Sequence, residues 1–193
     1  MALKNMKIII ALLMIFLQCT AIQEYLKSDV KTIDSRFLKE QTDEEKKELS
    51  KLTKQLIEAK NEMKKAELGI GITNQKIKIS KEFIILYEIM NAKEKVGLEK
   101  LYTNYLQTTL SDDEAILKLK QAELAKVKAD KDLLEAKIAK RNQAENIQVE
   151  EYEANFNSKI KELAEAQQKQ VGTDAQKKIS EEKLKSSGYK GWK

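Results

Sequence analysis

The chain has 193 residues, of which 35% are charged and 6% aromatic, with six glycines and no proline. Rich in Ala, Glu, Lys, Leu and Gln, it has the composition of long helices and coiled coils rather than of a domain with a deep core. Its net charge of +5 comes from 36 basic and 31 acidic residues. This near balance argues against a nucleic-acid partner, because a dedicated binder gathers basic residues on one face.

The absence of histidine limits the chemistry of the chain. Histidine is the usual general base near neutral pH and the commonest metal ligand. Acidic pairs such as Asp112 and Asp113 are interleaved with lysines, which is typical of a solvated helix face. We therefore expect no enzymatic activity, catalytic residue, metal site, cofactor or small-molecule substrate.

The N-terminus has the layout of an export signal. Lys4 and Lys7 precede an unbroken apolar run over residues 8–17, and the run stops at Gln18 and Cys19, the single cysteine. Ten residues span about 15 Å as a helix, roughly half of the hydrocarbon core, so the run is too short for a comfortable transmembrane anchor.

This layout predicts a signal peptide over residues 1–18, followed by a lipid-carrying Cys19 as the mature N-terminus. Residues 19–41 then form a lipidated end and a tether. A plain cleaved signal, or an uncleaved anchor in which Cys19 is incidental, are the alternatives.

Phe16-Leu17-Gln18-Cys19 resembles a relaxed lipobox, with Gln18 where a typical bacterial box has Gly, Ala or Ser. Lysine greatly exceeds the two arginines, Arg36 and Arg141, and proline and histidine are absent. In these features the chain resembles borrelial (spirochaetal) plasmid- or prophage-encoded helical lipoproteins, including the hemolysin-accessory or holin-accessory type. The resemblance implies an exported protein on the outer surface or in the periplasm that binds a host or envelope protein.

The first long helix begins at a capping box, because the Thr42 hydroxyl can accept from the Glu45 amide while the Glu45 carboxylate reaches back. Apolar residues then recur at steps of three and four, which predicts a stripe that packs against another helix. They are Leu49, Leu52, Leu56, Ala59, Met63, Ala66 and Ile70. Gly69 and Gly71 predict a break near residues 69–73, since each glycine costs a helix about 1 kcal/mol.

A second helical segment, to Thr109, carries apolar side chains around most of its circumference and so needs burial on more than one side. These residues are the candidate oligomer interface: Phe83, Ile84, Ile85, Leu86, Ile89 and Met90. A second copy of the chain would cover them. The alternative is that the C-terminal helix folds back, bringing Ile179 and Leu184 onto them.

Ser111 and Glu114 form another capping box, which predicts that the chain reverses there and continues as a helix to Val171. Gly172 can end that helix, leaving a short helix and a flexible tail over residues 172–193. Tyr189 and Trp192 in this tail are candidates for binding a partner, against the alternative that they fold onto the chain's own helices.

The expected fold is all-α, an elongated antiparallel helical hairpin with a coiled-coil seam. Its arms are residues 42–109, broken near 69–73, and residues 111–171. The expected function is a membrane-anchored, non-enzymatic interaction or spacer module at the bacterial envelope that forms homo-oligomers. The alternative is a prophage lysis accessory, similar to holin-associated proteins or spanins, with a periplasmic coiled coil.

Overall fold

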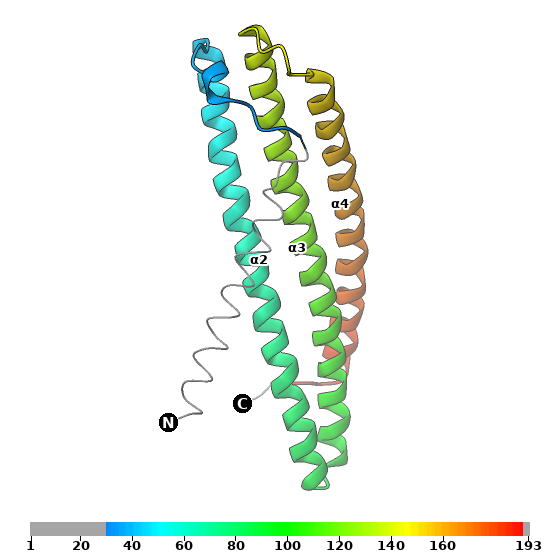
Figure 1. The fold of residues 1–193 in the computed structure, drawn as a ribbon. Helices are drawn as coiled ribbons and strands as arrows, with labels where there is room; N and C mark the ends of the chain where they lie inside the picture. Colours follow the sequence, from blue (N-terminus) through cyan, green and yellow to red (C-terminus); the bar gives the residue numbers. More distant parts are fainter. Residues whose placement is uncertain (1–29, 191–193) are drawn as a thin grey trace, which may run out of the picture. The chain divides into compact units, whose positions relative to one another are not determined.

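The computed structural model describes residues 30–190, which form a short 3₁₀ helix and three long α-helices (Figure 1). In chain order they are η1 (Ser35–Leu38), α2 (Asp43–Ile89), α3 (Lys93–Arg141) and α4 (Val149–Ser186). Residues 30–190 contain no β-strand, so the expected all-α class is confirmed. The predicted signal peptide, Cys19 and Trp192 lie outside the described residues.

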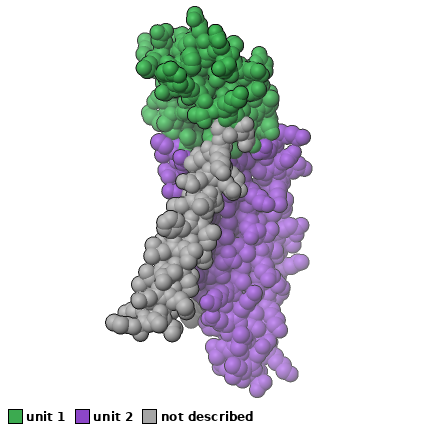
Figure 2. Space-filling view, in the orientation of Figure 1, with its two compact units in different colours: residues 1–56, 124–159 green, residues 57–123, 160–193 purple. Residues whose placement is uncertain are grey.

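Contacts along the chain divide it into two compact units (Figure 2). Of the described residues, 30–56 and 124–159 form unit 1, and 57–123 and 160–190 form unit 2. Each long helix contributes one segment to each unit. Within residues 30–190, no helix combines the length and apolarity that crossing a bilayer would require.

Helix α2 begins as the capping box predicts. The Glu45 amide donates to Thr42 Oγ1 at 3.2 Å, and the Thr42 amide donates to Glu45 Oε2 at 2.7 Å. Every member of the predicted apolar stripe from Leu49 to Ile70 is buried or half-buried. The prediction that this stripe packs against other helices is therefore confirmed.

The predicted break near residues 69–73 was wrong, because α2 continues through both glycines. Neither Gly69 nor Gly71 has a positive φ. The propensity cost of about 1 kcal/mol per glycine is small beside the packing on either side of them, where Met63 and Ile77 are buried.

The chain first reverses at residues 90–92, not at the predicted Ser111. Asn91 takes a left-handed φ of 53° and donates to the Glu88 carbonyl, while the Ala92 amide donates to the Tyr87 carbonyl. These two bonds form a Schellman C-cap, for which asparagine is the usual substitute for glycine. Helix α3 runs straight through Ser111. The neighbouring Asp112 is buried and accepts hydrogen bonds from Thr173 and Lys177 of α4.

A second reversal, over residues 142–148, lies within the arm that was expected to run to Val171. Gln143 has a φ of 64° and donates to the Lys140 carbonyl, and the buried Ala144 donates to Ala139. This is another Schellman arrangement. Helix α4 then passes through Gly172, so the two predicted arms and the separate short helix at 172–185 are replaced by three long helices.

In unit 1, residues 30–41 pack against α3 and α4 rather than forming the tether expected over residues 19–41. Val30, Ile33 and Phe37 contact a buried apolar cluster. The cluster comprises Leu133, Ala136, Ala139, Ala144, Ile147 and Tyr152. Burial of these side chains explains why this segment is held to the helices, since each large apolar group removed from water contributes about 1.5–3 kcal/mol.

Polar contacts also fix this segment of unit 1 to the helices. The Tyr152 hydroxyl donates to the Lys31 carbonyl at 2.6 Å. Asn142 Nδ2 donates to the carbonyls of Phe37 and Glu40 at 2.7 and 2.9 Å, and Arg141 Nη2 donates to Glu45 Oε2 at 2.7 Å. The Glu45 carboxylate therefore serves the N-cap of α2 and the end of α3 together.

The continuity of α2 and α3 can be tested with glycine substitutions. A Cβ added at Gly69 or Gly97 would meet no other atom within 4 Å, so alanine should fit without strain. We expect Gly69→Ala and Gly97→Ala each to raise the free energy of unfolding by about 0.5–1 kcal/mol, measured by urea denaturation. The control is Gly188→Ala, which should destabilise because Gly188 has a φ of +75°. A destabilised Gly69→Ala would instead indicate a break in α2.

Candidate interaction surface

Two buried hydroxyl groups fix how α2 faces α3 in unit 2. Thr73 Oγ1 donates to Asp113 Oδ2 at 2.6 Å, and Ser80 Oγ donates to Glu99 Oε1 at 2.5 Å. Ser80 Oγ also lies 2.7 Å from Thr103 Oγ1. Thr73 and Ser80 are seven residues apart, about two helical turns, so both point from the same side of α2.

The Glu99 carboxylate is also the centre of a contact with the C-terminal end of the described chain. It is 2% exposed, and its second oxygen accepts from the Tyr189 hydroxyl at 3.3 Å. The Tyr189 ring stacks on Tyr102 with centroids 4.7 Å apart. Burial, followed by the negative charge of Glu99, raises the pKa of the Tyr189 phenol well above its ordinary value.

A second polar cluster joins α3 to α4 within unit 2. The buried Asp112 accepts from Thr173 Oγ1 at 3.1 Å and from Lys177 Nζ at 3.0 Å. Burial alone would lower the pKa of Lys177, but the hydrogen bond and charge of Asp112 more than compensate, so the pKa is raised. Among the described residues, no buried side-chain nitrogen or oxygen lacks a hydrogen-bond partner.

Because one side of α2 is held inward, the opposite side of the helix faces solvent. That side carries five aliphatic residues, here called the outer seam: Leu68, Ile72, Ile79, Leu86 and Ile89. Their side chains are between 39% and 75% exposed. Ile72, Ile79 and Leu86 are spaced by seven, and the other two fall on the adjacent heptad position, so all five lie along one line.

The orientation of α2 buries part of the predicted interface at residues 83–90 and leaves the rest exposed. Phe83 and Ile84 are half-buried, and the Phe83 ring stacks with Tyr87 at 5.9 Å. The other four remain exposed: Ile85, Leu86, Ile89 and Met90. Four of the six predicted residues therefore lie on the surface beside the outer seam or within it.

The alternative in which the C-terminal helix folds over residues 83–90 does not account for the exposed residues. Leu184 is buried, as this alternative requires, but Ile179 is 47% exposed. Ile89, the most exposed of the group at 75%, is not covered. The C-terminal segment contributes to the interior of unit 2 and leaves the outer seam free.

Tyr189 is held by unit 2 rather than displayed on a flexible tail. Its half-buried ring lies against Tyr102 and its hydroxyl bonds to Glu99. This arrangement matches the alternative that a tail aromatic folds onto the chain's own helices. Trp192, the other candidate for binding a partner, is beyond the described residues, and its role stays a prediction.

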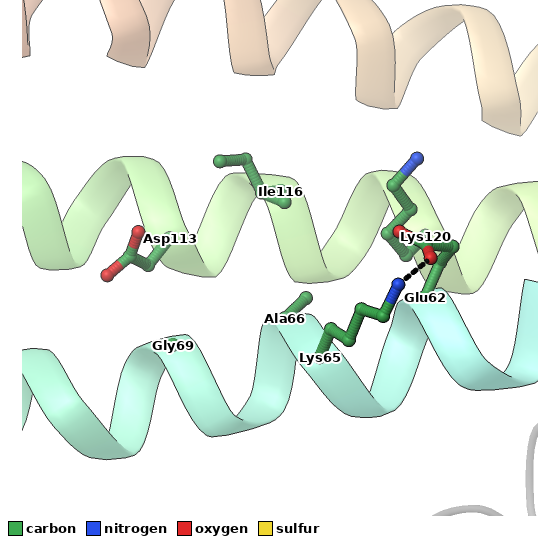
Figure 3. A pocket seen from close by; sticks show the side chains of 7 residues that line it. All are labelled: Glu62, Lys65, Ala66, Gly69, Asp113, Ile116 and Lys120. Atoms are coloured by element: carbon green, nitrogen blue, oxygen red, sulfur yellow. Dashed lines mark hydrogen bonds and ion pairs between the residues drawn. The ribbon is translucent and has the colours of Figure 1, made fainter.

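Unit 2 also has a shallow groove of about 270 Å³ between α2 and α3 (Figure 3). It is lined by Glu62, Lys65, Ala66, Gly69, Asp113, Ile116 and Lys120. Lys65 is ion-paired with Glu62 at 2.5 Å and Lys120 with Glu123 at 2.9 Å, while Asp113 accepts a hydrogen bond from Thr73. No group of three or more potential metal-ligating His, Cys, Asp or Glu residues occurs in the described part of the chain.

Sequence reasoning missed Leu68, Ile72 and Ile79 as surface residues, although their spacing from Leu86 was a usable signal. The burial of Ser80 and Glu99 could not be predicted from the sequence, because single polar residues are common throughout this chain. The chain matches no protein-family model, no curated protein and no solved structure at a significant level.

The contact between Tyr189 and Glu99 predicts a loss of stability at alkaline pH. A phenol whose pKa is raised in the folded state binds its proton more tightly there, so its contribution is complete below pH 10 and declines as pH rises further. We expect the free energy of unfolding, measured by urea denaturation, to fall above pH 10 less steeply in Tyr189→Phe than in the wild type.

Glu99→Gln provides the matched control for this titration. It removes the charge while leaving the burial of Tyr189 largely in place, so the total loss of stability above pH 10 should be smaller than in the wild type and larger than in Tyr189→Phe. Identical profiles for the wild type and Tyr189→Phe would show that the contact is not maintained in solution.

Proposed function

We propose that this protein is a membrane-anchored, non-enzymatic interaction module at a bacterial envelope. Its attachment is lipid at Cys19, and its binding surface is the outer seam of α2. The proposed export and attachment rest on the basic and apolar N-terminus that leads to the single cysteine. The binding role rests on one observation, the five exposed aliphatic residues from Leu68 to Ile89.

The outer seam is unusual for the surface of a protein that acts alone. Scattered exposed apolar residues are ordinary, but contiguous apolar patches on monomeric proteins are small and often functional. Here the exposed residues extend over 22 residues of one helix, about 33 Å, and they are aligned. Their heptad spacing favours a partner that presents another helix.

Lysines border the seam. Lys64, Lys76 and Lys78 are exposed on the flanks of the aliphatic line, while Glu82 and Gln75 interrupt it. A lipid surface would cover Glu82 and leave the carboxylate without water, which costs several kcal/mol. The flanking lysines and the polar residues Gln75 and Glu82 favour a helical protein partner, because polar residues in a helix–helix seam specify how the two helices are aligned along their length.

Attachment through Cys19 is tested by metabolic labelling with palmitate in a bacterial host that processes lipoproteins. We expect the wild-type chain to incorporate label and to sediment with membranes, and Cys19→Ala to do neither, because the lipid attached at Cys19 contributes about 0.8 kcal/mol for each CH₂ group buried in the bilayer. Gln18→Ala, which places a small residue before the cysteine, should be labelled at least as well. Equal labelling of wild type and Cys19→Ala would overturn the attachment.

The binding surface is tested separately by placing a photo-cross-linking amino acid at Leu86 in living cells. An adduct should form there and be absent from a control with the same amino acid at Val171, which is 66% exposed on α4. Mass spectrometry of the band identifies its components. Failure of Leu86 to give an adduct above the control would overturn the interaction role whether or not the chain is lipidated.

A further inference from the structure

We propose that the occupant of the outer seam is the outer seam of a second copy of this chain, paired parallel and in register. This inference rests on the proposed function and names its partner. Its basis is the order of residues along the seam together with their exposure. Leu68, Ile72, Ile79, Leu86 and Ile89 alternate between two heptad positions, at which Gln75 and Glu82 are the two polar residues.

A parallel pairing sets each seam residue against its own copy. Five of the seven layers are then aliphatic against aliphatic. Gln75 meets Gln75 of the second copy, and side-chain amides can hydrogen-bond to each other across such a layer and specify its alignment. Only the Glu82 layer brings like charges together. This repulsion weakens the affinity of the dimer but does not change the alignment of the two seams.

The antiparallel pairing with the longest overlap, over residues 68–86, is less favourable, and it leaves Ile89 without an aliphatic partner. It would place Glu82 against Ile72 and Gln75 against Ile79, so that four layers combine a polar with an aliphatic side chain. Burying a charged or polar group against aliphatic carbon without a hydrogen-bond partner is costly. Leu68 against Leu86 would be the aliphatic pair that remains.

The flanking lysines favour the same choice. In the antiparallel arrangement Lys76 would face Lys76 of the second copy, and Lys78 would face Lys78, which are like-charge contacts. In the parallel arrangement Lys78 lies beside Phe83 of the second copy, and Lys76 lies beside Gly71. Within residues 68–89, no lysine is opposed by another lysine.

The inward side of α2 is compatible with this pairing because it is already used within unit 2. Thr73, Ile77 and Ser80 are buried against the chain's own helices, on the opposite side from the seam. Chains attached to one membrane through their N-termini would also share one direction, and confinement to a surface raises their effective concentration. Both circumstances favour a parallel pair.

Cysteine cross-linking tests the partner and its direction in the full chain carrying Cys19→Ser. Ile79→Cys should form a disulfide-linked dimer under mild oxidation, because equivalent positions in a parallel pair bring the two Cα atoms within disulfide range. Val171→Cys, at a more exposed position away from the seam, should cross-link at least tenfold more slowly. An antiparallel pair would instead link Leu68→Cys with Leu86→Cys in a mixture, while Ile79→Cys alone would not react.

Sedimentation equilibrium of the same full chain measures the affinity. Ile72→Glu should raise the dimer Kd at least tenfold, Glu82→Leu should lower it at least tenfold, and Val171→Glu should leave it unchanged, with circular dichroism confirming that each variant stays helical. A monomer at tens of micromolar, or Glu82→Leu without effect, would overturn the pairing. If Leu86 nevertheless cross-links to a different protein in cells, the interaction role stands and only the second copy is excluded.

Discussion

The arrangement of unit 2 depends on the hydrogen bonds that Thr73 and Ser80 make from α2 to α3. Both acceptors, Asp113 and Glu99, are carboxylates, and Ser80 and Glu99 are almost fully buried. A rotation of α2 about its axis would break both hydrogen bonds, and a buried polar group that loses its hydrogen bond costs about 1–3 kcal/mol. The rotation is therefore fixed, and with it the set of residues that face outward.

This constraint explains why an apolar helix exposes part of its apolar surface. Helix α2 carries aliphatic residues on two sides, and the polar contacts select which side enters the bundle. Met63 and Ile77 are buried with Thr73 and Ser80, while Ile72 and Ile79 remain on the surface. An apolar layer at Ser80 would allow neighbouring rotations of similar energy, whereas a satisfied polar layer permits one. The same contacts that order unit 2 internally thus leave the outer seam exposed.

At the helix ends, tertiary contacts outweigh local capping preferences. Ser111 and Gly172 have the residue types of a helix start and a helix end, yet α3 and α4 pass through them. Capping is worth about 1 kcal/mol, and Asp112 gains more from its ion pair and hydrogen bond to α4. Asn91 and Gln143 end helices in the left-handed conformation, where glycine would have been the expected residue.

The all-α class, the start of α2 at its capping box and the apolar stripe from Leu49 to Ile70 could be predicted from the sequence, because helical periodicity and capping are local properties. The positions of the turns, the packing of residues 30–41 on α3 and α4 within unit 1, and the exposed side of α2 follow only from the tertiary structure. These depend on partners distant in sequence, such as Glu99 for Ser80 and Asn142 for Phe37, which no local pattern specifies.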